Sequence, residues 1–280
     1  MRAILLIRPD IFQSLGLQNQ NTKIRDNSVL LDWRTTYKDH RSSSFFEITD
    51  RILAVQQTDR MPFGSAWDHY FPFDSKNVRE KFNNPSSFIF FMRLSLYRPR
   101  DIITMLGILQ ENVALGGKTD RDSFSPKDIG LPEFRNKYSE YLLGEIKDHL
   151  LFYYSLQDYE EFLKFFEFLE GSVRFSYKKF LGAFNDFDKD IASRVRSKPP
   201  FMESANAFLQ FLFTLNVISY LEESEDGHTF IHWCFRERSY SNISPKVKTY
   251  ERYEIHYGLA PALNIGKRLK RRASGKIKMT

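Results

Sequence analysis

Arginine side chains stand at two places in the sequence where they could bind a phosphate group. Arg8 follows an apolar run over residues 3–7, and Arg98 and Arg100 flank a proline. A guanidinium can donate two parallel hydrogen bonds to a phosphate, so both places are candidate nucleotide contacts. An arginine at the end of a strand can equally form a structural ion pair.

Carboxylates stand close to these arginines without forming a catalytic pair. We expect Asp10 to orient Arg8. We expect Asp101 in the first turn of a helix, where the helix dipole favours a negative charge. Neither carboxylate has a partner that would make a general acid and base couple, so the chemistry indicated is binding of an anion.

Two apolar runs near the N-terminus predict strands. Residues 3–7 and 29–31 consist of Ala, Ile, Leu and Val, a pattern typical of strands buried on both faces of a parallel sheet. Ligands bind at the carboxyl edge of such sheets, which is where Arg8 would stand. Two strands cannot make a sheet alone, so we expect them to belong to a larger domain whose N-terminal half the chain lacks.

The rest of the chain predicts a mainly α fold with some β. Apolar residues at helical spacing predict helices over residues 42–57, 86–96, 101–115, 133–153, 158–169, 176–185 and 202–215. Strands are predicted at 217–221 and 229–235, joined by a tight turn at Asp226 and Gly227, with a third at 252–256. Three helices followed by a β-hairpin are the arrangement of a winged helix.

Three motifs, in this order along the chain, resemble parts of bacterial P-loop ATPases of the STAND and AAA+ kind, including FunZ-like proteins. They are Leu6-Ile7-Arg8-Pro9-Asp10, Lys23-Ile24-Arg25-Asp26-Asn27 and Tyr97-Arg98-Pro99-Arg100-Asp101. The resemblance implies residual strands of a P-loop ATPase core over residues 1–41, a helical lid over 42–153, a winged-helix domain over 154–265 and a basic disordered tail over 266–280.

The same resemblance implies nucleotide-sensing roles for the arginines. Arg8 would lie beside the γ-phosphate, and Arg100 would be carried by the lid and close onto the nucleotide. Arg98 is a further candidate on the lid. Arg25 would contact nucleotide in a neighbouring subunit, or pair with Asp26 or Asp32.

The chain lacks the loop that would cradle the phosphates of ATP. A Walker A motif needs Gly-x4-Gly-Lys-Ser/Thr after a strand. Gly117-Lys118-Thr119 fails this pattern, because position 112 is Asn and the segment follows a helix. No acidic strand end of the Walker B type offers a ligand for Mg²⁺. We therefore expect that this chain alone does not hydrolyse ATP. We expect it to use ATP and Mg²⁺ as cofactors only together with the missing half.

Composition and cysteine content indicate a globular cytoplasmic protein. Of 280 residues, 42% are hydrophobic and 27% charged, which is ordinary for a globular chain. The single cysteine, Cys234, cannot form an internal disulfide, as is typical of a reducing compartment. No apolar run reaches the roughly 18 residues that a membrane span needs. His232 lies near Cys234, but without a second ligand pair we expect packing and no metal.

Positive charge is concentrated at the C-terminus. Seven cations lie in the last fourteen residues: Lys267, Arg268, Lys270, Arg271, Arg272, Lys276 and Lys278. The rest of the chain carries a formal charge of −1, since the whole carries +6. This tail could bind nucleic acid nonspecifically. The predicted third helix of the winged helix has no Lys or Arg, which argues against DNA recognition by that helix.

Two hypotheses follow. The leading one is a nucleotide-sensing, regulatory portion of an ATPase that acts as an ATP-dependent switch, with the missing ATPase half, a neighbouring copy or a protein effector as partner. The alternative is a winged-helix module that binds a protein or nucleic acid and uses no nucleotide. No membrane is expected in either.

Overall fold

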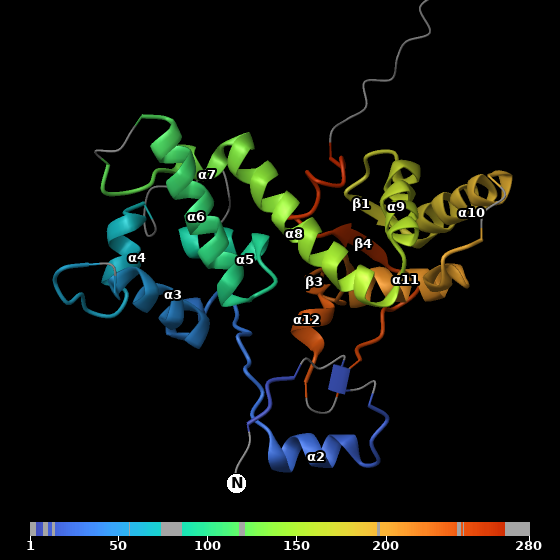
Figure 1. Ribbon diagram of the computed structural model, residues 1–280, viewed down its shortest axis with the longest axis horizontal. Coiled ribbons are helices and arrows are strands. Elements are labelled where there is room, and N and C mark those ends of the chain that lie inside the picture. The colour runs from blue at the N-terminus through green and yellow to red at the C-terminus, as the bar shows by residue number, and fades with distance from the viewer. Residues whose placement is uncertain are drawn as a thin grey trace, which may run out of the picture.

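The computed structural model describes residues 4–7, 11–12, 15–55, 57–73, 86–117, 121–194, 197–239, 242 and 244–266. They form a mainly helical structure with one four-stranded antiparallel sheet. The elements lie in two groups, and the long helix α8 (Pro132–Tyr153) runs from one group to the other (Figure 1). The short helix α2 (Gln20–Asn27) lies apart from both groups.

The first group, which we call the helical module, packs around aromatic side chains. It contains η1 (His40–Ser42), α3 (Ser44–Val55), α4 (Ser65–Tyr70), α5 (Ser87–Leu94), α6 (Pro99–Leu115), α7 (Pro126–Gly130) and the N-terminal part of α8. The buried Trp67 meets Phe88 and Phe91 edge to face, with ring centroids 4.9 and 5.3 Å apart. The buried Asp50 accepts hydrogen bonds from the amides of Gly64 and Trp67 at 2.7 and 2.8 Å, which fixes the start of α4.

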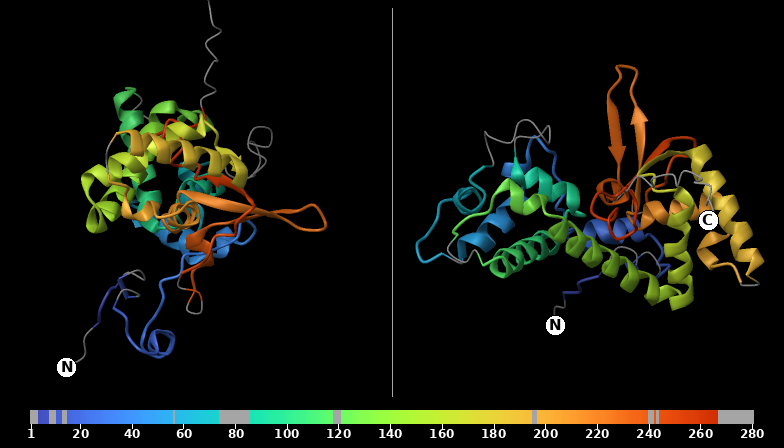
Figure 2. Two further views of the ribbon diagram at one scale, coloured as in Figure 1. Left: turned by 90° about the vertical axis from the view of Figure 1, so that its right-hand side faces the viewer. Right: turned by 90° about the horizontal axis from the view of Figure 1, so that it is seen from above.

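The second group, which we call the sheet module, begins after α8. It contains α9 (Leu156–Phe165), η2 (Phe166–Leu169), β1 (Arg174–Ser176), α10 (Tyr177–Ser193), η3 (Pro200–Met202), α11 (Ala205–Thr214), β2 (Ile218–Glu223), β3 (Thr229–His232), α12 (Cys234–Glu237) and β4 (Arg252–Ile255). The strand order is β1-β4-β2-β3 and all pairs are antiparallel. The β2–β3 hairpin projects from the body (Figure 2).

Local sequence explains where the helices of the sheet module begin. The hydroxyls of Ser155, Ser176 and Ser204 each accept a hydrogen bond from an amide in the first turn of α9, α10 and α11 respectively. The three helices then bury aromatic residues against one another. Phe165 and Phe208 lie edge to face, with ring centroids 4.7 Å apart.

The segment after β4 returns to the helical module and joins the two groups. The Ala262 amide donates to the Ser139 hydroxyl at 2.9 Å, and Ser139 is fully buried in α8. Gly258 packs so closely that a Cβ there would lie 2.5 Å from Leu142 Cδ1 and 2.6 Å from the Leu94 carbonyl oxygen. Only glycine fits this contact, so the junction is built for close approach of the two modules.

The prediction that residues 3–7 and 29–31 are buried strands is wrong for the residues that the structure describes. Residues 4–7 and 29–31 belong to no strand, and Leu6 and Val29 are 92% and 87% exposed. The physical reason is that a strand needs a neighbour to pair its backbone groups. The sheet in the described residues is antiparallel and made from β1 to β4 alone, so it offers these runs no parallel neighbour.

The predicted helices and hairpin agree better with the structure. The predicted helix at 133–153 is α8, and the predicted third strand at 252–256 is β4. The second hairpin strand ends at His232, because Cys234 begins α12. Residues 224–228 form the turn, where Gly227 has the positive φ of +75° expected at this position. Within the described parts of the chain, no helix combines the length and apolar character needed to cross a membrane.

Candidate anion-binding site at the start of helix α6

The turn between α5 and α6 presents the two arginines that the sequence singled out. Ser95 is the C-cap residue that follows α5, and its hydroxyl accepts a hydrogen bond from the Tyr97 amide at 3.2 Å. Tyr97 has a positive φ of +54°, an uncommon conformation for a large side chain. Pro99 then starts α6 as its first residue, where its missing amide hydrogen costs nothing. Arg98 and Arg100 therefore flank the first residue of a 17-residue helix.

Asp101 fixes Arg98. The carboxylate accepts hydrogen bonds from Arg98 Nε at 3.0 Å and from Nη2 at 2.6 Å. It also accepts from the Leu96 amide at 2.9 Å and from the Tyr141 hydroxyl at 3.3 Å. Asp101 is 0% exposed, so its charge is compensated almost entirely by these donors. Asp101 does lie in the first turn of α6, as expected, but its role here is to hold Arg98.

Glu145 of α8 contacts both arginines. Its Oε2 atom lies 3.1 Å from Arg98 Nη1 and is also paired with Arg100 Nη2. The Glu145 side chain is 24% exposed, whereas that of Arg100 is 59% exposed. Two guanidinium groups and two carboxylates meet here, so the cluster is formally neutral. A phosphate could reach this pair through the exposed Arg100, and it would compete with Glu145.

Burial and charge pairing shift the pKa values in the cluster. Burial acts to lower the pKa of Arg98, but the hydrogen bonds to Asp101 and the charges of Asp101 and Glu145 outweigh it, so the pKa is raised. Burial raises the pKa of Tyr141, and the nearby Asp101 charge adds to this effect. Arg98 is therefore a permanent cation and Tyr141 a neutral hydrogen-bond donor at neutral pH.

The same turn contacts the sheet module. The Tyr97 ring stacks on Phe45 of α3 with centroids 5.8 Å apart, and meets Phe235 of α12 at 5.2 Å. The Arg236 guanidinium lies over the Tyr97 ring, 5.7 Å from its centroid. Arg34 Nη1, from the N-terminal part of the chain, donates to the Arg236 carbonyl oxygen at 3.1 Å. Three parts of the chain therefore meet beside the arginine pair.

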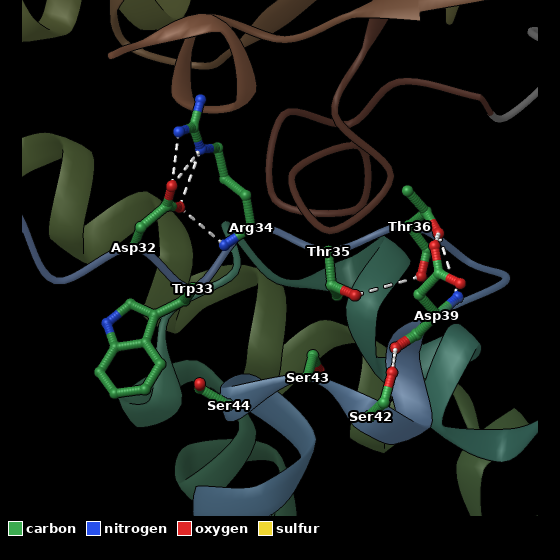
Figure 3. Close-up of a pocket in the computed structure, with 9 residues that line it drawn as sticks. All are labelled: Asp32, Trp33, Arg34, Thr35, Thr36, Asp39, Ser42, Ser43 and Ser44. Carbon is green, nitrogen blue, oxygen red and sulfur yellow. Dashed lines mark hydrogen bonds and ion pairs between the residues drawn. The ribbon is translucent and has the colours of Figure 1, made fainter. Parts of the chain in front are cut away.

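An open groove lies nearby, at the start of α3. Figure 3 shows its lining, and its volume is about 410 Å³. It is lined by Asp32, Trp33, Arg34, Thr35, Thr36, Asp39, Ser42, Ser43 and Ser44. Most of its polar groups are used locally: Arg34 pairs with Asp32 at 2.5 Å, the Thr36 hydroxyl donates to Asp39 at 2.7 Å, and the Ser43 hydroxyl accepts from the Phe46 amide at 3.2 Å. These groups cap α3 and fix the loop before it, so we do not place the site here.

Several sequence-predicted residues lie elsewhere. Arg8, Asp10 and the tail cations Lys267, Arg268, Lys270, Arg271 and Arg272 lie outside the described residues. Arg25 pairs with Asp26 at 3.1 Å, and its side chain is 73% exposed. Among the predicted site residues that the structure describes, Arg98, Arg100 and Asp101 are brought together.

Glu145 is the residue that sequence reasoning missed. It lies on the same helix as Tyr141, four positions later, so both face the start of α6. The four-residue spacing of Tyr141 and Glu145 was the only sequence signal that the two side chains share a helix face. A carboxylate one turn after a tyrosine is common on helices, so this signal does not single out Glu145. The partner across the interface becomes visible only when α6 and α8 pack.

His232 and Cys234 have different surroundings in the structure. His232 Nδ1 lies 2.5 Å from Glu237 Oε1 and Nε2 lies 3.2 Å from Glu222 Oε2, so the ring is held by carboxylates. Cys234 is buried at the start of α12, and burial raises its pKa. In the described part of the chain, no cluster of His, Cys, Asp and Glu could hold a metal ion.

Comparisons with protein-family models, with curated proteins and with solved structures found no match for this chain.

Proposed function

We propose that this chain is a nucleotide-sensing, regulatory portion of a P-loop ATPase, which acts as an ATP-dependent switch and does not hydrolyse ATP by itself. The observation that carries the proposal is that Arg98 and Arg100 lie side by side on one turn, which both modules contact. A guanidinium that responds to phosphate at this turn would affect Tyr97, and Tyr97 packs against the sheet module through Phe235.

The helical module would be the lid of the ATPase. Arg100 is the candidate for contact with the nucleotide because it is the more exposed arginine, and Arg98 would support the turn through Asp101. ATP and Mg²⁺ would be held mainly by another part of the ATPase that carries the Walker A and Walker B residues. That part, on a partner polypeptide or a neighbouring copy, is the proposed partner.

The exposed apolar runs support such a partner. Residues 4–7 and 29–31 belong to no helix or strand and are rich in Leu, Ile and Val, and most of their side chains are in contact with solvent. Covering apolar side chains at this exposure lowers the free energy of the system by about 25 cal/mol per Å² of apolar surface. We propose that the partner covers these runs in the assembled protein.

The sheet module would be the winged helix that transmits the position of the lid. Its order of α9, β1, α10 and α11 followed by a hairpin supports this assignment. Its third helix is poorly suited to DNA. Gln210 of α11 donates to the Pro245 carbonyl at 3.0 Å and accepts from the Val247 amide at 2.9 Å, so the chain itself covers this helix.

The proposal is tested first in the genome and then by turnover. We expect an adjacent or in-frame segment with Gly-x4-Gly-Lys-Thr, and a clean intergenic gap would contradict the proposal. The complex of that segment with this chain should hydrolyse ATP, and Arg100→Ala should lower kcat by about 10-fold or more with the complex intact. The control is Arg51→Ala, an exposed arginine of α3 paired with Glu47. Equal turnover in both variants would refute the role of Arg100.

One observation favours the alternative of a binding module without nucleotide. Asp101 and Glu145 together already neutralise the arginine pair, so the cluster needs no phosphate to be satisfied. Under this alternative, Arg100→Ala leaves binding of every nucleotide unchanged. Nucleic-acid binding through the tail is tested separately: salt-sensitive DNA binding lost on truncation after Gly266 supports it, and unchanged binding refutes it.

A further inference from the structure

The arginine pair is occupied by a carboxylate of its own chain. One oxygen atom of Glu145 contacts both Arg98 and Arg100, and it comes from α8, a different helix from the one that the arginines begin. A carboxylate between two guanidinium groups has the charge and acceptor geometry of one edge of a phosphate. The contact is therefore a direct competitor for any phosphate at this place.

The two arginines differ in freedom. Arg98 is held by the buried Asp101 through both carboxylate oxygens, and its side chain is 27% exposed. Arg100 forms an ion pair with Glu145, and the Arg100 side chain is 59% exposed. An anion from solvent would therefore meet Arg100 first, while Arg98 stays fixed beneath it.

We propose that Glu145 is a resident counter-ion that occludes the Arg98–Arg100 pair, and that a polyphosphate binds by displacing it. The inference rests on the proposed nucleotide-sensing function for the class of ligand. Removal of the Glu145 charge changes the cluster from formally neutral to +1. Displacement also releases α8 from the start of α6 at this point, which links phosphate binding to the helix that connects the two modules.

Other contacts between α6 and α8 define a control. Lys137 of α8 pairs with Glu111 of α6 at 3.5 Å, and the Glu111 side chain is 67% exposed. Glu111→Gln removes one negative charge from the same pair of helices without touching Arg98 or Arg100. It therefore measures the effect of net charge alone, and the basic tail is present in both variants.

The experiment is a calorimetric titration of the full chain with inorganic tripolyphosphate, which measures the dissociation constant. Glu145→Gln should bind at least about 10-fold more tightly than the wild type, a difference of about 1.4 kcal/mol. Glu111→Gln should stay within about 2-fold of the wild type. Arg100→Gln in the Glu145→Gln background should abolish the gain. Equal affinities of Glu145→Gln and Glu111→Gln, or a gain that survives Arg100→Gln, would overturn the proposal.

A second measurement covers the case in which Glu145→Gln does not fold. Tripolyphosphate should increase hydrogen exchange of the α8 amides around Glu145 in the wild type, because the ion pair to α6 is broken. Unchanged exchange at saturating tripolyphosphate would contradict displacement. Two outcomes separate this inference from the proposed function. If Glu145→Gln binds tripolyphosphate more tightly but no ATPase partner exists, the counter-ion role of Glu145 stands without the proposed function. If ATP turnover depends on Arg100 but is unchanged by Glu145→Gln, the proposed function stands and the counter-ion role is refuted.

Discussion

The imidazole of His256 donates a hydrogen bond from Nε2 to the Ser95 carbonyl oxygen, 3.2 Å away and 161 positions earlier in the chain. The direction follows from the other ring nitrogen, since Nδ1 accepts from the Gly258 amide at 3.2 Å and must be unprotonated. His256 directly follows the strand β4 of the sheet module, and Ser95 directly follows α5 of the helical module. A neutral histidine therefore joins the sheet module by a hydrogen bond to the turn that carries Arg98 and Arg100.

This contact predicts a loss of stability at mildly acidic pH. Burial lowers the pKa of His256 from 6.5 to about 4. The unfolded chain therefore binds one proton more than the folded chain between these values, and stability falls as pH falls from about 6.5 to about 4. The shift corresponds to an order of 3 kcal/mol. Denaturant unfolding at pH 7 and pH 4.5 should show this loss in the wild type.

His256→Gln is the control for the pH effect. Glutamine keeps a donor but does not titrate, so the variant should lose less stability than the wild type over the same range. It should be less stable than the wild type at pH 7, because its amide cannot reproduce both ring contacts. Parallel pH curves for the two proteins would show that His256 does not titrate in this window.

Gly258 provides a prediction about the junction. A Cβ at this position would meet the Leu94 carbonyl oxygen at 2.6 Å, and backbone atoms cannot move aside cheaply. Gly258→Ala should destabilise the protein by about 1–3 kcal/mol. Gly107→Ala in α6 has open space around its Cβ and should stabilise by about 0.5–1 kcal/mol. Thermal unfolding of both variants checks this, and equal melting temperatures would mean that the two modules do not approach closely at Gly258.

Asp101 should be the most sensitive carboxylate of the cluster. Asp101→Asn removes the buried carboxylate that the half-buried Arg98 guanidinium contacts through both oxygens, which should cost about 3–5 kcal/mol. Asp26→Asn removes the exposed partner of Arg25 and should cost less than about 1 kcal/mol. The midpoints of urea unfolding give both values. A small effect of Asp101→Asn would show that Arg98 finds another partner.

The exposed N-terminal run allows a test that separates stability from assembly. Leu6 is 92% exposed, so Leu6→Asp should change the free energy of unfolding of this chain by less than about 0.5 kcal/mol. In complex with the proposed ATPase half, the same change should weaken association, because a charge would be buried in the contact with the partner. Destabilisation of the isolated chain by several kcal/mol would mean that Leu6 is already buried within it.

Much of the local structure could be predicted from the sequence. Pro99 after an extended residue marks the start of α6, the serine before each of α9, α10 and α11 marks a cap, and Gly227 marks the hairpin turn. These signals act within a few residues, because caps, turns and helical spacing are properties of neighbouring positions. The arginines at the start of α6 were found in the same way.

The sequence by itself determined the helices α3, α5, α6, α8, α9, α10 and α11 and the strands β2, β3 and β4, and it determined that Arg98 and Arg100 stand at a helix start. Only the tertiary structure decided that Glu145 holds both arginines, that His256 reaches Ser95, and that residues 4–7 make no strand in the described fold. The physical reason is that ion pairs, buried hydrogen bonds and sheet ladders depend on which surfaces meet across many positions of chain. A local pattern records the tendency of a segment, whereas its partner is chosen by packing.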